Sequence, residues 1–292
     1  MPLLIKINEN IKKFIKKDKF TLKKEKKAYS HNVYKVETDD KDYIYKEYTR
    51  RSKTETKILE ALGRKFIVDN DEFRIEEYLD SEMPDYLVHA KLIGESLREF
   101  HKLNIKIRSF FDLLENLIKK NNFEEKLEEI INKVYARIKE KHLKFNKVTV
   151  CHNDLQPGNI LIHKNKAVLI DFEYASTNHP MFDYANIFCE MSCDYSNECA
   201  LKKELLPSES TKREILKWYD KNNLEENLSI ANELMSSSHF LWYLWARPYI
   251  GKNNNNDFNY INYAISRLTM LKEENILKNE EFNFLKNDLK NK

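Results

Sequence analysis

Glycine is scarce in this chain of 292 residues, which holds only Gly63, Gly94, Gly158 and Gly251. None of them belongs to a G-x-G-x-x-G turn or to a G-x-x-x-x-G-K-[ST] loop. Both motifs need closely spaced glycines so that backbone N–H groups can approach a phosphate. The sequence therefore argues against a Rossmann dehydrogenase and against an enzyme of the P-loop class.

Cysteine is sparse and long apolar runs are missing. The four cysteines lack the paired spacing of a zinc site and the density of a disulfide scaffold, so we expect reduced thiols. No run approaches the roughly 18 apolar residues of a membrane span, and the N-terminal segment lacks the apolar core of a secretory signal. These absences predict a globular protein of the cytoplasm with no transmembrane segment.

Positive charge is concentrated in residues 1–30, which hold ten lysines against three acidic residues. Apolar residues recur at helical spacing between these lysines: Leu4, Ile7, Ile11, Phe14 and Ile15. Such a helix can dock on its own domain or lie on an anionic membrane surface, and docking is the commoner case. No basic stripe with interleaved aromatic residues accompanies the lysines, so we expect no nucleic-acid partner.

Strand and helix patterns divide the chain unevenly. Segment 32–48 has the composition of two strands around a polar turn, and a helix near 54–62 and a strand at 73–79 follow. Beyond about residue 80 the apolar periodicity is mainly helical, and the charged segment from Lys272 onward is expected to be a solvated helix or tail. We therefore predict an α+β fold with a small strand-rich lobe over 1–79 and a larger helical lobe over 80–292.

The clearest chemistry lies in CHNDLQPGNILIHKNKAVLIDFEY, residues 151–174. A proline and a glycine interrupt any helix between Asp154 and Asn159, so this part is predicted to be a loop. A hairpin that pairs Ile162 with Ala167 would then bring Asp171 beside Asn159. An Asp that accepts the proton of an attacking hydroxyl, with an Asn and a second Asp holding magnesium, is typical of ATP-dependent phosphoryl transfer. Ordinary loop polar residues are the alternative.

The motif H-N-D-x-x-x-x-N followed by I-D-F-E-Y resembles the choline/ethanolamine kinase family, relatives of the aminoglycoside phosphotransferases and of the protein kinases. The similarity continues through NHPMFDYANIFCEMSCDY, residues 178–195, and SHFLWYLWA, residues 238–246. It implies a protein-kinase-like two-lobed fold, ATP and Mg²⁺ as cofactors, and choline as the acceptor that becomes phosphocholine. Ethanolamine kinase or dual activity is the nearest alternative. The resemblance also allows a homodimer.

The resemblance assigns a role to each matching residue. It implies nucleotide contacts for Ser30, His31, Asn32, Lys46, Glu55, Glu77, Tyr78, Leu79 and Gln156, although the first three stand where the family has a glycine-rich turn. It implies metal ligands at Asn159, Asp171 and Glu173, the last of which projects to the same side as Asp171 if the strand persists. Asp183 and His152 are expected to brace the catalytic loop.

The acceptor pocket implied by the resemblance contains Asp154, Glu190, Tyr195, Trp242, Trp245, Tyr260 and Tyr263. A quaternary ammonium cannot donate a hydrogen bond, and aromatic faces meet its diffuse charge best. Aromatic side chains at helical spacing are more often core residues, which is the alternative for each pair. Asp194 follows Glu190 by four residues and is expected to add acidic charge from the same helix.

Two functions outside this family stay open. A kinase-like binding protein without activity is suggested by the degraded glycine turn at residues 30–32, whereas the intact Asp154, Asn159 and Asp171 argue against it. An antibiotic kinase would need an open acidic cleft for a polyamine in place of paired tryptophans.

Overall fold

The computed structural model describes residues 2–25, 31–195, 200–252 and 258–292. The chain divides into two compact units, Met1–Ser81 and Glu82–Lys292. The division falls two residues beyond the end of the predicted N-terminal lobe.

The first unit contains an antiparallel sheet of five strands in the order β1-β2-β3-β5-β4. The strands are β1 (Thr21–Lys24), β2 (Asn32–Glu37), β3 (Asp42–Glu47), β4 (Val68–Asp69) and β5 (Phe73–Glu77). The predicted hairpin is confirmed, because β2 pairs with β3 across a turn at residues 38–41. Two helices complete the unit, α1 (Pro2–Ile15) and α2 (Lys53–Ala61).

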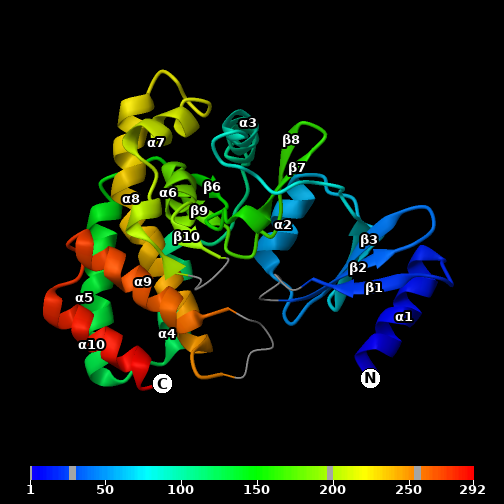
Figure 1. Cartoon of the computed structure of the whole chain (residues 1–292), viewed down its shortest axis with the longest axis horizontal. Coiled ribbons are helices and arrows are strands. Elements are labelled where there is room, and N and C mark those ends of the chain that lie inside the picture. The colour runs from blue at the N-terminus through cyan, green and yellow to red at the C-terminus, as the bar shows by residue number, and fades with distance from the viewer. Residues whose placement is uncertain (1, 26–30, 196–199, 253–257) are drawn as a thin grey trace. The chain divides into compact units, whose positions relative to one another are not determined.

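Helix α1 is docked on this sheet (Figure 1). Ile7 and Ile11 are fully buried in one apolar cluster with sheet residues. The sheet side of the cluster consists of Tyr34, Val36, Tyr43, Tyr45, Phe73 and Ile75. Alternate residues of a strand share a face, so β2 and β3 offer α1 a continuous apolar surface. The helix therefore docks on its own domain, as the sequence favoured.

The second unit is built around one long helix, α8 (Leu224–Ala246), which packs against α6 and α9 (Figure 1). The C-terminal half of α8 is almost entirely buried. Its other helices are α3 (Ala90–Phe100), α4 (Phe110–Asn121), α5 (Glu125–His142), α6 (Met181–Glu190), α7 (Glu209–Leu216), α9 (Tyr260–Glu273) and α10 (Asn279–Lys290). Among the described residues, no helix is both long and apolar enough to cross a membrane.

Short strand pairs position the loops of this unit. They are β6 (Thr149–Cys151) with β9 (Ser176–Asn178), β7 (Ile160–His163) with β8 (Lys166–Leu169), and β10 (Cys193–Asp194) with β11 (Ala200–Leu201). Single turns of 3₁₀-helix also occur among the described residues: η1 (Pro157–Asn159), η2 (Lys203–Leu205) and η3 (Arg247–Tyr249). The β7–β8 register pairs Ile162 with Ala167, which confirms the predicted hairpin.

The C-terminal segment differs from the expected solvated helix or tail. Helix α9 continues to Glu273, and α10 buries Phe282, Leu285 and Leu289. These three residues recur at helical spacing, so α10 has an apolar face that packs against α9. Not all of its charges face solvent, because Glu281 is also buried and pairs with Arg137.

Candidate active site

A buried carboxylate braces the predicted catalytic loop. Asp183, in the first turn of α6, accepts hydrogen bonds from the backbone N–H groups of His152 at 3.0 Å and Asn153 at 2.7 Å. Its Oδ2 also lies 2.8 Å from Nε2 of His101. Asn153 has a φ of 66°, a left-handed conformation that asparagine tolerates better than most residues. The side chain of Asp183 therefore connects the backbone of the catalytic loop to α6.

Asp154 and Asn159 meet within this loop. Nδ2 of Asn159 donates to Oδ2 of Asp154 at 2.8 Å and to its backbone oxygen at 2.9 Å. The amide oxygen of Asn159 is consequently turned away from Asp154 and can serve as a ligand. Burial raises the pKa of Asp154 well above its usual value, and the charges of Glu190, Asp171 and Glu173 raise it further. Four carboxylates thus act on one another in this region.

The residues after β8 return the chain to Asn159. The backbone N–H of Ile170 donates to the oxygen of Asn159 at 3.0 Å, which places Asp171 beside Asn159 as the hairpin predicted. The strand itself ends at Leu169, and Asp171 has a φ of 62°. The strand does not persist to Glu173, so strand alternation cannot place this residue, and its role as a metal ligand stays a prediction. Asn159, Asp171 and Glu173 still offer the hard oxygen ligands that Mg²⁺ prefers.

A second group of side chains has the composition of a metal site. Ligand atoms of His101, Cys151 and Asp183 lie within 4.8 Å of one another. Asp183 is already engaged by the backbone of the catalytic loop, and burial raises the pKa of Cys151 well above its usual value. A protonated thiol is a poor ligand. Within this group, Asp183 connects His101 to the backbone of the catalytic loop.

The four predicted pocket aromatics come together. Trp242 and Trp245 of α8 have ring centroids 5.6 Å apart, and Trp245 lies 5.6 Å from Tyr260 and 6.1 Å from Tyr263 of α9. Tyr174, three residues after Asp171, packs on Trp242 at 5.2 Å and joins the aromatic cluster to the catalytic loop.

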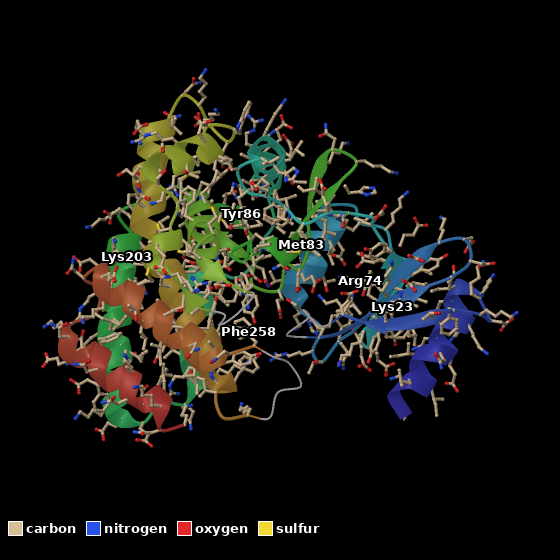
Figure 2. All side chains as sticks on the ribbon, in the orientation of Figure 1. Lys23, Arg74, Met83, Tyr86, Lys203 and Phe258 are labelled. Atoms are coloured by element: carbon tan, nitrogen blue, oxygen red, sulfur yellow. The ribbon has the colours of Figure 1, made fainter. Side chains whose placement is uncertain are left out.

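Sequence reasoning missed three aromatics of this cluster: Tyr174, Tyr249 and Phe258. Phe258 is labelled in Figure 2. Tyr249 follows Trp245 by four residues, a spacing that could have indicated it. Phe258 precedes α9, and its ring centroid lies 4.8 Å from that of Tyr260 with the two planes tilted. No periodic signal in the sequence indicates this contact.

Glu190 is buried at the end of α6, next to the aromatic cluster. Its Oε1 accepts from Nη2 of Arg267 at 2.5 Å, and its Oε2 accepts from the hydroxyl of Tyr195. Asp194 lies beyond the helix in β10, where it pairs with Lys202 at 2.8 Å, so the expected helical spacing from Glu190 was wrong. Arg267 was not predicted, although it follows Tyr263 by one helical turn.

The first unit holds the predicted cation and its partner. Nζ of Lys46 lies 3.3 Å from Oε1 of Glu55, and both side chains are buried. Arg74, which the sequence analysis missed, reaches the same oxygen at 3.2 Å (Figure 2). Lys46 and Arg74 are direct partners in the β3–β5 ladder, so their side chains share one face. One carboxylate therefore orients two cations.

The remaining nucleotide residues stay predictions. Ser30 lies outside the described residues. His31 accepts from the backbone N–H of Thr49 at 3.3 Å, and Asn32 donates to Glu47 at 3.0 Å. The backbone N–H of Tyr78 donates to the backbone oxygen of Asp42 at 2.9 Å, and the Glu77 side chain forms an ion pair with Lys41. Leu79 lies just after β5, and Gln156 lies just before η1. The Tyr78 N–H therefore already has a hydrogen-bond acceptor within the first unit.

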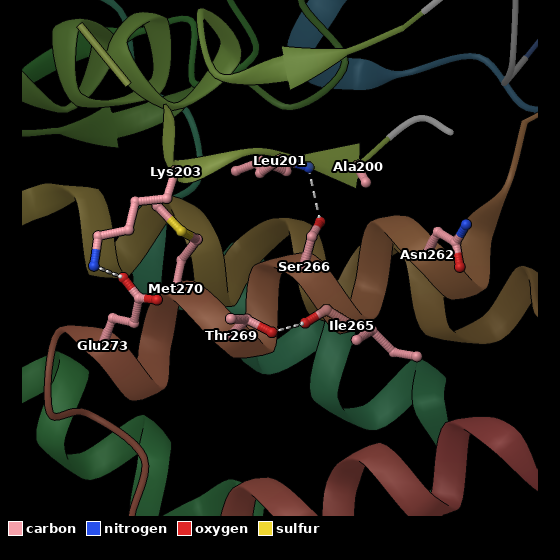
Figure 3. Close-up of a pocket in the computed structure, with 9 residues that line it drawn as sticks. All are labelled: Ala200, Leu201, Lys203, Asn262, Ile265, Ser266, Thr269, Met270 and Glu273. Atoms are coloured by element: carbon pink, nitrogen blue, oxygen red, sulfur yellow. Dashed lines mark hydrogen bonds and ion pairs between the residues drawn. The ribbon is translucent and has the colours of Figure 1, made fainter. Parts of the chain in front are cut away.

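A surface groove of about 410 Å³ lies along α9 and β11 (Figure 3). It is lined by Ala200, Leu201, Lys203, Asn262, Ile265, Ser266, Thr269, Met270 and Glu273. None of these nine residues is aromatic, so the groove does not have the character of an ammonium pocket. Its contacts are structural: Ser266 accepts from the Leu201 N–H at 3.0 Å, and Lys203 pairs with Glu273 at 2.7 Å.

The sequence profile of the choline/ethanolamine kinase family matches residues 15–272. The chain belongs to this family. A relative described as probable choline kinase 1 from Arabidopsis thaliana is 30% identical over an alignment of 204 positions, and the match covers 61% of this chain and 58% of the relative. The chain thus spans less than two thirds of the length of that curated relative.

Solved structures of the family share the fold. A choline kinase from Cryptosporidium parvum superposes with a TM-score of 0.70 at 18% identity, covering 94% of this chain and 98% of the other. An ethanolamine kinase from Plasmodium vivax gives 0.71 at 20% identity, covering 92% and 87%. The predicted protein-kinase-like α+β fold, with a strand-rich N-terminal part and a helical C-terminal part, is confirmed.

Proposed function

We propose that this protein is a choline kinase that transfers the γ-phosphoryl group of ATP to choline, giving phosphocholine for phosphatidylcholine synthesis. The observation that carries the proposal is the junction of two sites in one unit. The hydrogen-bonded Asp154–Asn159 pair is joined through Tyr174 to the cluster around Trp242 and Trp245. A general base thus lies next to a surface suited to a quaternary ammonium.

Each residue of the loop has a defined task in this reaction. Asp154 accepts the proton of the attacking hydroxyl, and Asn159 holds that carboxylate in position through its amide N–H. The oxygens of Asn159, Asp171 and Glu173 would hold Mg²⁺, which would neutralise the charge of the phosphates when bound. Lys46, oriented by Glu55, is the expected phosphate-contacting cation of the first unit.

Ethanolamine is the alternative acceptor, because relatives of both descriptions share this fold. A primary ammonium brings three N–H donors and needs acceptors, whereas choline needs aromatic faces. Seven aromatic rings meet in this cluster, which favours choline: Tyr174, Trp242, Trp245, Tyr249, Phe258, Tyr260 and Tyr263. An inactive binding protein is disfavoured by the intact, hydrogen-bonded Asp154 and Asn159.

A competition assay tests this function. The full chain is supplied with ATP, Mg²⁺ and equal concentrations of choline and ethanolamine, and the two phosphorylated products are measured by mass spectrometry. We expect phosphocholine to dominate. An excess of phosphoethanolamine would replace the proposal by ethanolamine kinase, and ATP hydrolysis without either product would contradict both.

A further inference from the structure

Arg267 on α9 is a fully buried guanidinium that contacts two predicted pocket residues. Its Nη2 donates to Oε1 of Glu190 at 2.5 Å and to the hydroxyl of Tyr263 at 2.6 Å. The guanidinium carbon also lies 4.7 Å from the Tyr263 ring centroid. A buried arginine is stable only when it is paired, so these contacts fix both pocket side chains.

Arg267 also contacts a residue outside the predicted acceptor pocket. Its Nη1 lies 3.3 Å from Nδ1 of His239, a buried residue of α8. Nε2 of the same histidine lies 3.4 Å from Glu274, which follows the end of α9. Arg267 therefore belongs to a charged chain that crosses the α8–α9 interface, and its position does not depend on the acceptor.

The pairing changes what Glu190 can offer to a ligand. One carboxylate oxygen accepts from Arg267 and the other accepts from Tyr195. The negative charge of Glu190 is thus compensated inside the protein, and both oxygens already have a strong donor. A primary ammonium that entered the pocket would have to compete with Arg267 and Tyr195 for these acceptors.

We propose that Arg267 is a positioning residue that makes the pocket select quaternary over primary ammonium acceptors, because it compensates the negative charge of Glu190 and already takes one of its acceptor sites. The inference rests on the proposed function, which supplies the acceptor class. Choline loses nothing by this arrangement, since its trimethylammonium group has no N–H to donate and is bound by aromatic faces. Ethanolamine, whose ammonium group has three N–H donors, meets a Glu190 carboxylate whose charge is already compensated by Arg267.

The test measures binding, which keeps it separate from turnover. Dissociation constants of choline and ethanolamine are determined by calorimetry for the full chain and for Arg267→Met, Arg267→Lys and Tyr195→Phe. Arg137→Met is the matched control, because Arg137 forms a two-pronged ion pair with Glu281 between α5 and α10. Turnover of the unmodified protein on both acceptors, measured in parallel, tests the proposed function alone.

Arg267→Met should lower the preference for choline over ethanolamine by about tenfold, the equivalent of one charge-assisted hydrogen bond. Tyr195→Phe keeps the ring and frees the other oxygen, so it should shift the preference in the same direction. Arg267→Lys should retain most of the preference because it restores a charged donor, and Arg137→Met should leave it unchanged.

The proposal is overturned if folded Arg267→Met keeps the original preference, or if Arg267→Lys loses as much preference as Arg267→Met. If Arg267→Met fails to fold, Tyr195→Phe decides: an unchanged preference contradicts the proposal. Unmodified protein that binds the acceptors with the expected preference, but phosphorylates neither, would reject the proposed function and leave the role of Arg267 in selectivity supported.

Discussion

At the scale of single residues, the neutral state of His142 matters for stability. His142 ends α5 and is buried between Ser237, whose hydroxyl lies 3.1 Å from Nδ1, and Asn178, whose Oδ1 lies 2.8 Å from Nε2. Burial lowers the pKa of His142 from 6.5 to about 4. The folded state thus binds the proton less readily than the unfolded chain.

The sign of the pH dependence follows from this depressed pKa. Between pH 6.5 and about 4, His142 is protonated in the unfolded chain but neutral in the folded protein. The free energy of unfolding therefore falls as the pH drops through this range. A pKa difference of this size corresponds to about 3 kcal/mol. Urea unfolding of the unmodified protein and of His142→Gln at pH 7 and pH 5 measures the part of this loss, about 2 kcal/mol, that falls between these two pH values. We expect a smaller loss of stability in the variant, and an equal loss would contradict the assignment.

At the scale of elements, the docking of α1 depends on two isoleucines. Ile11 is fully buried against the sheet, whereas Ile5 on the same helix is 56% exposed. Ile11→Ala should destabilise the docked helix by about 2 to 5 kcal/mol, because a buried side chain is lost and a cavity remains. Ile5→Ala is the control and should change stability by less than about 0.5 kcal/mol.

Hydrogen exchange of the α1 backbone amides measures this effect directly. Faster exchange throughout α1 in Ile11→Ala, with unchanged exchange in Ile5→Ala, is the expected result. Equal rates in both variants would mean that α1 is held by something other than its apolar face.

Elements whose pattern is local were predictable. The β2–β3 and β7–β8 hairpins are fixed by short turns and alternating residues, so their existence and the pairing of Ile162 with Ala167 followed from the sequence. Helix α10 was read as solvated because its charges outnumber its apolar residues. Its burial depends on α9, a partner that no local pattern identifies.

The candidate site likewise contains residues that the sequence identifies and residues that depend on tertiary packing. Asp154, Asn159 and Asp171 lie in one continuous motif, so they could be named from the sequence. The two aromatic pairs were assigned to the pocket by the family resemblance, because helical spacing alone favours core residues. Arg267 and Arg74 could not be named from the sequence. Arg267 meets Glu190 across 77 positions, and Arg74 meets Glu55 across 19, so each depends on tertiary packing.

At the scale of the whole molecule, we expect turnover to depend on Asp154, which belongs to the second unit. Lys46, the expected phosphate-contacting cation, belongs to the first. Asp154→Asn keeps the size and hydrogen-bonding oxygen of the side chain but cannot accept the hydroxyl proton. Nucleotide binding and chemistry should therefore separate in this variant. Asp71→Asn, whose side chain is 97% exposed, is the matched control.

The most direct measurement is phosphocholine formation followed by phosphorus NMR in the unmodified protein and in both variants, with ATP binding measured beside it. We expect the unmodified protein and Asp71→Asn to form phosphocholine at similar rates. Asp154→Asn should bind ATP normally and form phosphocholine at least about a hundredfold more slowly. Near-normal phosphocholine formation by folded Asp154→Asn would contradict the account.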